Sequence, residues 1–104
     1  MCPPKDAVPI DGEFYRLCKN ATPNIDDFIT HYERNNIPRG EECRARALSF
    51  FESLEGAERL KNTVWKFKNY IPVTIKITPQ HGIGKVDSKG HLDLWEYSGK
   101  SFIP

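Results

Sequence analysis

The 104-residue chain lacks several features that would assign it to a well-marked class of protein. It has no long apolar run, so we expect no segment that spans a membrane. Its first residues, MCPPKDAVPIDG, contain no apolar stretch of the kind found in a secretory signal. Fifteen basic residues against fourteen acidic ones leave a net charge of +1. Because dedicated nucleic-acid binders carry a strongly basic surface, the composition predicts that nucleic acid is not a partner.

The cysteines and histidines show no spacing that is typical of a metal site. Cys2, Cys18 and Cys43 are odd in number and widely separated, and no CxxC pair occurs. This usage predicts reduced thiols and a cytoplasmic protein. The histidines, His31, His81 and His91, form neither an HxH nor an HExxH pattern, so we expect no bound metal.

Signatures of common enzyme classes are missing as well. No serine lies in a GxSxG elbow, and the stretch GIGKVDSKG has neither the spacing of a phosphate-binding loop nor a following helix. RNA cleavage by His81 and His91, with Lys85 and Lys89 nearby, remains a remote alternative. The hairpin expected at this place would keep the two imidazoles apart, so ordinary surface or half-buried histidines are favoured.

What the sequence does contain is a regular series of strand and helix patterns. Period-2 alternation and turn residues predict strands at 13–18, 47–51, 70–78, 82–87 and 91–97. Apolar residues at helical spacing predict helices at 23–35 and 53–65, with a polar loop over 37–46. The first helix would be capped by Thr22 and the second by Ser53.

This order of elements predicts the fold class. Two early helices followed by strands gathered at the end favour α+β, a small and mostly antiparallel sheet with two helices packed on it. Residues 1–12, which contain Pro3, Pro4, Pro9 and Gly12, are expected to form an extended arm. Residues 13–104 would form a single domain, since a chain of this length has room for one core.

Candidate binding residues lie on three of the predicted strands. Arg16 stands between apolar neighbours on the first strand, Ser49 precedes Phe50 and Phe51 on the second, and Glu96 lies near the end of the last. Arginine can bind phosphate with a fork of N–H donors, a serine hydroxyl can bond a ribose, and aromatic rings can stack on a planar base. Taken one at a time, a salt-bridging arginine, a corner serine and core aromatics are the favoured explanations.

The order of these residues resembles the small ADP-ribosyltransferase-like folds. FYRL on the first strand and LSFF before a helix are similar to the RES-domain toxins and to compact ADP-ribosyltransferase-like toxins of bacterial type VI secretion, over residues 13–60. The resemblance implies that NAD is the substrate. Arg16 would contact its phosphates or ribose, Tyr15 and Phe51 would border the nicotinamide, Ser49 would bond the nicotinamide ribose, and Glu96 would be the catalytic acid. The family's paired acidic motif before the last strand is missing.

Two functions of different classes follow. The first is a toxin-like NAD-using enzyme, an ADP-ribosyltransferase or NAD glycohydrolase, which would act with a cognate antitoxin or another neighbouring protein as partner. The second is a non-catalytic protein-binding module of the antitoxin, immunity or accessory-subunit kind. The aromatic residues of the C-terminal part, Trp95, Tyr97 and Phe102, suit protein contacts.

Overall fold

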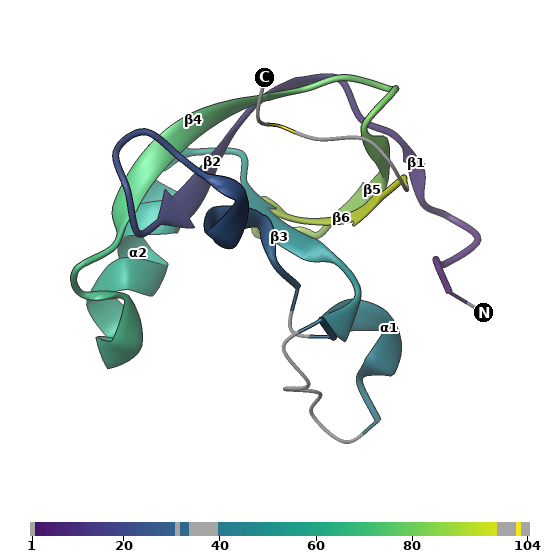
Figure 1. Ribbon diagram of the computed structural model, residues 1–104. Helices are drawn as coiled ribbons and strands as arrows, with labels where there is room; N and C mark the ends of the chain where they lie inside the picture. The colour runs from purple at the N-terminus through teal and green to yellow at the C-terminus, as the bar shows by residue number, and fades with distance from the viewer. Residues whose placement is uncertain (1, 31, 34–39, 98–101, 103–104) are drawn as a thin grey trace.

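The computed structural model describes residues 2–30, 32–33, 40–97 and 102, and they fold around one antiparallel sheet (Figure 1). Its strands are β1 (Val8–Pro9), β2 (Gly12–Cys18), β3 (Leu48–Phe51), β4 (Ile71–Ile77), β5 (Gly82–Val86) and β6 (His91–Glu96). They lie in the order β1-β5-β6-β3-β2-β4. The predicted α+β class is therefore confirmed, and the strands predicted from alternation agree with β2 to β6 within a residue or two.

The predicted hairpin is formed by β5 and β6. Its turn is stabilised by Asp87, whose carboxylate accepts hydrogen bonds from the backbone N–H groups of Lys89 at 2.8 Å and His91 at 3.0 Å. Gly90 completes the turn with φ 82°, a left-handed conformation that glycine adopts without strain. On both sides of the turn, successive side chains of β5 and β6 alternate between the two faces of the sheet, so every second side chain faces the core.

The second predicted helix is confirmed as α2 (Leu54–Thr63), which follows a cap at Ser53. The Ser53 hydroxyl accepts a hydrogen bond from Gly56 N at 3.1 Å, which satisfies one of the free amides at the helix start. In Figure 1, α2 lies beside β2 and β4, and its buried Ala57 allows close packing on the sheet. A short 3₁₀ turn, η2 (Trp65–Phe67), continues from it.

The prediction of a first helix at 23–35 is wrong for those of its residues that the structure describes. The chain forms only the 3₁₀ turn η1 (Ile25–Phe28), capped by Asn24 instead of Thr22, and is extended at Ile29. Ile25 is 74% exposed and only Phe28 reaches the core, so the apolar stripe is not buried as a helix face. Residues 31 and 34–35 of that prediction lie outside the described residues.

The loop predicted at 37–46 also needs correction. It contains a single helical turn, α1 (Glu42–Ala45), and its residues 37–39 lie outside the described part. Ala45 is buried, and Trp95 Nε1 donates to Cys43 O at 3.0 Å. This turn therefore rests on the face of β6 that points away from the main core.

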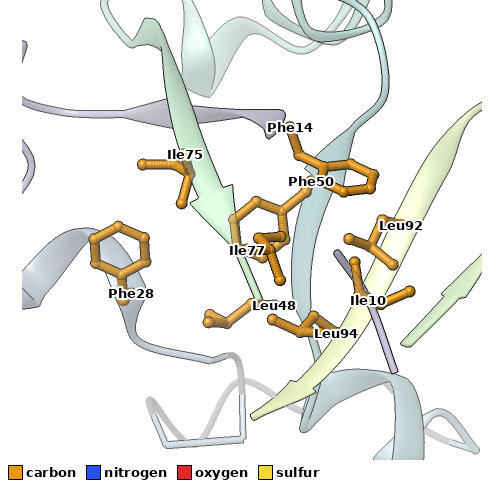
Figure 2. Close-up of a cluster of buried hydrophobic side chains, with 9 residues drawn as sticks. All are labelled: Ile10, Phe14, Phe28, Leu48, Phe50, Ile75, Ile77, Leu92 and Leu94. Atoms are coloured by element: carbon orange, nitrogen blue, oxygen red, sulfur yellow. The ribbon is translucent and has the colours of Figure 1, made fainter. Parts of the chain in front are cut away.

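One apolar cluster fills the inner face of the curved sheet (Figure 2). Its members are Ile10, Phe14, Phe28, Leu48, Phe50, Ile75, Ile77, Leu92 and Leu94. Ile77 comes from β4 and Ile10 follows β1, although these are the two end strands of the sheet. Both can reach one cluster only because the sheet curls around it. Ile10 lies within the predicted arm, and β1 pairs with β5, so part of this segment is built into the fold.

The prediction of reduced cysteines is wrong for two of the three. Cys2 and Cys43 form a disulfide that joins the N-terminal segment to α1, with their Cα atoms 5.4 Å apart. Their separation of 41 residues gives no spacing signal in the sequence. Because disulfides persist in oxidising compartments, the cysteines no longer support a cytoplasmic location. Cys18 is a buried free thiol, and burial first, then the charge of Asp27, raises its pKa to about 11.

Candidate functional site

The sheet is continuous on one side of β3 and almost interrupted on the other. β3 pairs with β6 through four residue pairs, from Leu48↔Leu94 to Phe51↔His91. It pairs with β2 through one, Tyr15↔Phe51, while β2 continues along β4 as far as Cys18↔Ile71. β2 and β3 therefore separate beyond Tyr15, and a gap opens in the sheet where both strands still present backbone groups.

The side chain of Arg16 spans this gap. Its Nη1 donates to Ser49 O at 2.7 Å and its Nε donates to Asp27 O at 2.8 Å. The guanidinium carbon lies 5.7 Å from the ring centroid of Phe28 and 5.5 Å from that of Phe50, within range of a cation–π interaction. Arg16 thus replaces the missing backbone pairing by a side chain that joins β2, β3 and η1.

This position differs from the salt-bridging arginine considered above, since both hydrogen bonds of Arg16 go to backbone carbonyls. Burial, the largest influence, lowers the pKa of its guanidinium, and the nearby groups of Cys18 and Asp27 oppose that change. Arginine carries five N–H donors, and the two hydrogen bonds above are those it makes to described residues. Up to three donors thus remain for a ligand beside it.

A cleft of about 500 Å³ lies at the opening between the two strands. Its apolar wall comes from the α2–η2 side, with Leu60, Val64, Phe67 and Tyr70. The rings of Phe67 and Tyr70 meet edge to face at 4.9 Å between centroids. A volume of this size can hold a small molecule, and its lining is mixed, with polar and apolar residues in similar numbers.

The polar wall of the cleft is formed by the loop that follows β2. Lys19, Asp27 and Thr30 line it there, and Lys66 lines it on the side of η2. The charged side chains of the lining are three cations, Arg16, Lys19 and Lys66, and two carboxylates, Asp26 and Asp27. None of these lysines was singled out from the sequence, because their convergence depends on how the loop and η2 fold over the strands.

The carboxylate of Asp27 is already engaged. It accepts hydrogen bonds from Lys19 N at 2.7 Å, Asn24 N at 3.1 Å and Asn20 Nδ2 at 3.2 Å. Burial on its own raises the pKa of Asp27, but these hydrogen bonds and the charge of Arg16 together lower it below the ordinary value. Asp27 therefore stabilises the loop as an ionised group, with its oxygens occupied.

Three of the residues predicted as a site line the cleft together, and two do not. Arg16, Ser49 and Phe51 all contribute to its wall. Tyr15 lies next to Phe51 across the strand pair but is not part of the lining. Glu96 is exposed at the end of β6 opposite Gly82, and it is also outside the lining. Burial and the charge of Glu33 raise the pKa of Glu96, while Arg16 lowers it.

The histidines that the structure describes lie apart. His81 precedes β5, accepts a hydrogen bond from Thr78 N at its Nδ1 and stacks on Phe102 at 4.3 Å. His91 begins β6 at the other end of the hairpin and meets the ring of Phe51 edge to face. His31 lies outside the described residues. Within residues 2–30, 32–33, 40–97 and 102, no group of three His, Cys, Asp or Glu side chains is arranged to hold a metal ion.

Comparisons with known proteins identify no relative of this chain. No protein-family model matches the chain, and no curated protein or solved structure matches it either. Among the described residues, no helix has the length and apolar character needed to cross a membrane.

Proposed function

We propose that the protein binds NAD in the cleft between β2 and β3 and acts as an ADP-ribosyltransferase-like or NAD-hydrolysing enzyme of the bacterial toxin type. The observation that carries this proposal is that Arg16, Ser49 and Phe51 line one cleft. Arg16 lies 33 residues before Ser49 in the sequence, and Phe51 follows Ser49 on the same strand. They are also the ones to which the resemblance assigns phosphate or ribose contact, ribose hydroxyl contact and nicotinamide contact.

The chemistry of the walls supports a nucleotide of this kind. Phe51 and the pair Phe67 and Tyr70 offer apolar and aromatic surface for a planar ring. The Ser49 hydroxyl has no hydrogen-bond partner among the described residues, so it can bond a ribose hydroxyl. Unused N–H groups of Arg16, together with Lys19 and Lys66, suit the pyrophosphate.

Calorimetric titration with NAD, and assays of nicotinamide release with and without cell extract, test the proposal. Removing the Ser49 hydroxyl by Ser49→Ala should weaken NAD binding about two- to tenfold, the usual range for one hydrogen bond. Phe51→Leu should weaken it about tenfold through loss of ring stacking. Ser88→Ala, in the exposed hairpin turn, and Tyr97→Leu, outside the cleft lining, serve as matched controls and should bind as the unmodified protein does. Absence of NAD binding by the unmodified protein would contradict the proposal.

A second candidate function, a protein-binding module, is favoured by one specific observation. Trp65 on η2 is 78% exposed, and exposed tryptophans are frequent anchors of protein interfaces. Under this alternative the protein is tolerated when expressed alone in a bacterial host and co-purifies with a protein encoded beside it. Trp65→Ala should abolish that co-purification, whereas Ser49→Ala should leave it unchanged. Growth arrest by the protein alone, relieved by Ser49→Ala, would favour the enzyme.

A further inference from the structure

The charges of the chain nearly balance in total but are divided unevenly along it. Residues 59–86 contain six basic residues and no acidic one: Arg59, Lys61, Lys66, Lys68, Lys76 and Lys85. The first four of them lie at the end of α2, in η2 and directly after it. The acidic side chains of α2, Glu55 and Glu58, precede this stretch. A nearly neutral protein thus has one segment with a local excess of positive charge.

The same segment carries the most exposed large apolar side chain that the structure describes. Trp65 is 78% exposed, whereas the second tryptophan, Trp95, is buried. Lys68 Nζ lies 4.8 Å from the centroid of the Trp65 ring. Lys66 Nζ lies 5.0 Å from the centroid of the Phe67 ring. Neither ammonium group forms an ion pair with a described residue, so an exposed indole and two uncompensated charges lie together.

This indole stands on a short turn at one end of the molecule. α2 ends at Thr63, the backbone is extended at Val64, and η2 then forms a single turn. In Figure 1, α2 and the turn that follows it lie at the side of the molecule away from β1 and β5. Trp65 and Lys68 do not line the cleft, although Lys66 does. The turn therefore presents its indole outward, next to the mouth of the cleft.

An outward indole with lysines beside it matches the headgroup layer of an anionic lipid bilayer. Tryptophan is enriched at that depth, because its ring is apolar and its N–H group can still form a hydrogen bond. Lysine reaches the lipid phosphates with its ammonium group while its methylene stem stays in less polar surroundings. In protein interfaces, by contrast, an anchoring tryptophan normally lies in a well-packed pocket. The neighbours Lys66, Lys68 and Asn69 are exposed and polar, which favours the lipid surface.

We propose that Trp65, together with Lys66 and Lys68, docks the protein reversibly on the surface of an anionic lipid bilayer. The indole enters the headgroup layer, and the two ammonium groups bind lipid phosphates. Such docking is peripheral and needs no segment that crosses the bilayer. Because Lys66 also lines the cleft, the docked protein holds the cleft mouth beside the bilayer. The docking goes beyond NAD binding and does not depend on it.

Vesicle binding by the full chain tests the docking. Vesicles of phosphatidylcholine with phosphatidylglycerol supply an anionic surface, and vesicles of phosphatidylcholine alone are the neutral comparison. Co-sedimentation gives the affinity, and a change in tryptophan fluorescence reports Trp65, since Trp95 is buried. We expect binding to the anionic vesicles to be about tenfold tighter or more. Most of this difference should disappear between about 0.1 M and about 1 M salt, where the Debye length falls from about 10 Å to about 3 Å.

Two substitutions outside the cleft lining separate the turn from the rest of the surface. Lys68→Ala should weaken binding to the anionic vesicles about fivefold. Trp65→Ala should weaken it about tenfold through loss of buried apolar area. Lys89→Ala, in the exposed hairpin turn, and Tyr97→Ala, at another exposed ring, are the matched controls and should each change binding less than about twofold. Because all four side chains are exposed, the denaturation midpoints should stay unchanged.

Several results would overturn the docking. Absence of binding to the anionic vesicles at low salt would do so, as would equal binding to the neutral ones. An equal loss in Lys68→Ala and Lys89→Ala would show that only net charge matters. Tighter binding to polyglutamate or to a single-stranded oligonucleotide, lost in Trp65→Ala, would assign the turn to an acidic protein or to nucleic acid instead. A dimer that Trp65→Ala dissociates would assign it to a second copy of the chain. NAD titration is a separate measurement, so failure of the proposed function leaves these outcomes unchanged.

Discussion

The two sides of β3 are built by different interactions. Toward β6, four residue pairs join the strands by backbone hydrogen bonding, and side-chain identity matters mainly for packing. Toward β2, one pair remains, and Arg16 makes the connection with two hydrogen bonds to backbone carbonyls. The paired side is closed and holds the core, whereas the separated side opens into the cleft. The cleft thus lies where backbone pairing ends and a side chain joins the strands instead.

The largest effect is expected on the paired side, from Gly84→Val on β5. A Cβ at this position would lie 2.7 Å from a methyl carbon of Leu92 and 2.8 Å from Asp93 O, so β5 and β6 could not keep their spacing. We expect a loss of about 3 kcal/mol in the free energy of unfolding, measured by chemical denaturation. Thr74→Val, at an exposed position of β4, is the control and should change stability by less than about 0.5 kcal/mol. Equal stability of the two variants would contradict the close approach.

A smaller effect is expected at the separated side, from Arg16→Lys. A single ammonium group cannot replace a fork that reaches both Ser49 O and Asp27 O, so one half-buried carbonyl loses its donor. The free energy of unfolding should fall by about 2 kcal/mol, in the range for one hydrogen bond to a charged group. Arg59→Lys, on the exposed surface of α2, should have almost no effect. An unchanged denaturation midpoint for Arg16→Lys would show that β2 and β3 are held together in another way.

The smallest change in the free energy of unfolding is expected from Asp27 in the loop beside the cleft, and this change depends on pH. Because the pKa of Asp27 is lower in the folded protein than in the unfolded chain, its contribution to stability is present above the unfolded value, near 4, and is lost as pH falls through the folded value. Asp27→Asn should cost about 1 kcal/mol at pH 7, and the difference from the unmodified protein should shrink toward pH 2. Denaturation midpoints measured between pH 7 and pH 2 check this, with Asp11→Asn on the surface as control. A difference that stays constant with pH would exclude the ionised Asp27.

Part of the candidate site could be predicted from local pattern alone. The alternation in LSFF places Ser49 and Phe51 on one face and Leu48 and Phe50 on the other, and the structure keeps this division. The face of Arg16 was also predictable, since it alternates with Phe14 and Cys18. Its hydrogen bonds were not, because they depend on β3 and η1, which lie 33 and 11 residues away along the chain.

The predictions that the structure corrects also have physical explanations. The helix expected at 23–35 depended on an apolar stripe, but the capping box formed by Asn24 and Asp27 holds a single turn, and the chain then extends at Ile29. The cysteine spacing gave no hint of the disulfide, because Cys2 and Cys43 meet only after the arm has paired with β5. The pairing of Ser49 with Asp93 has no local signal either, because it depends on the register between β3 and β6.

The sequence by itself determined the strands β2 to β6, the hairpin turn and α2, since alternation, turn residues and a cap act over a few neighbouring residues. Only the tertiary structure decided that β2 and β3 separate, that Arg16 bridges them and that Asp93 lies beside Ser49. These features depend on pairing between segments that are distant in the sequence. Such pairing is stabilised by the closed core, and no local pattern specifies it. The cleft is for that reason a property of the sheet as a whole.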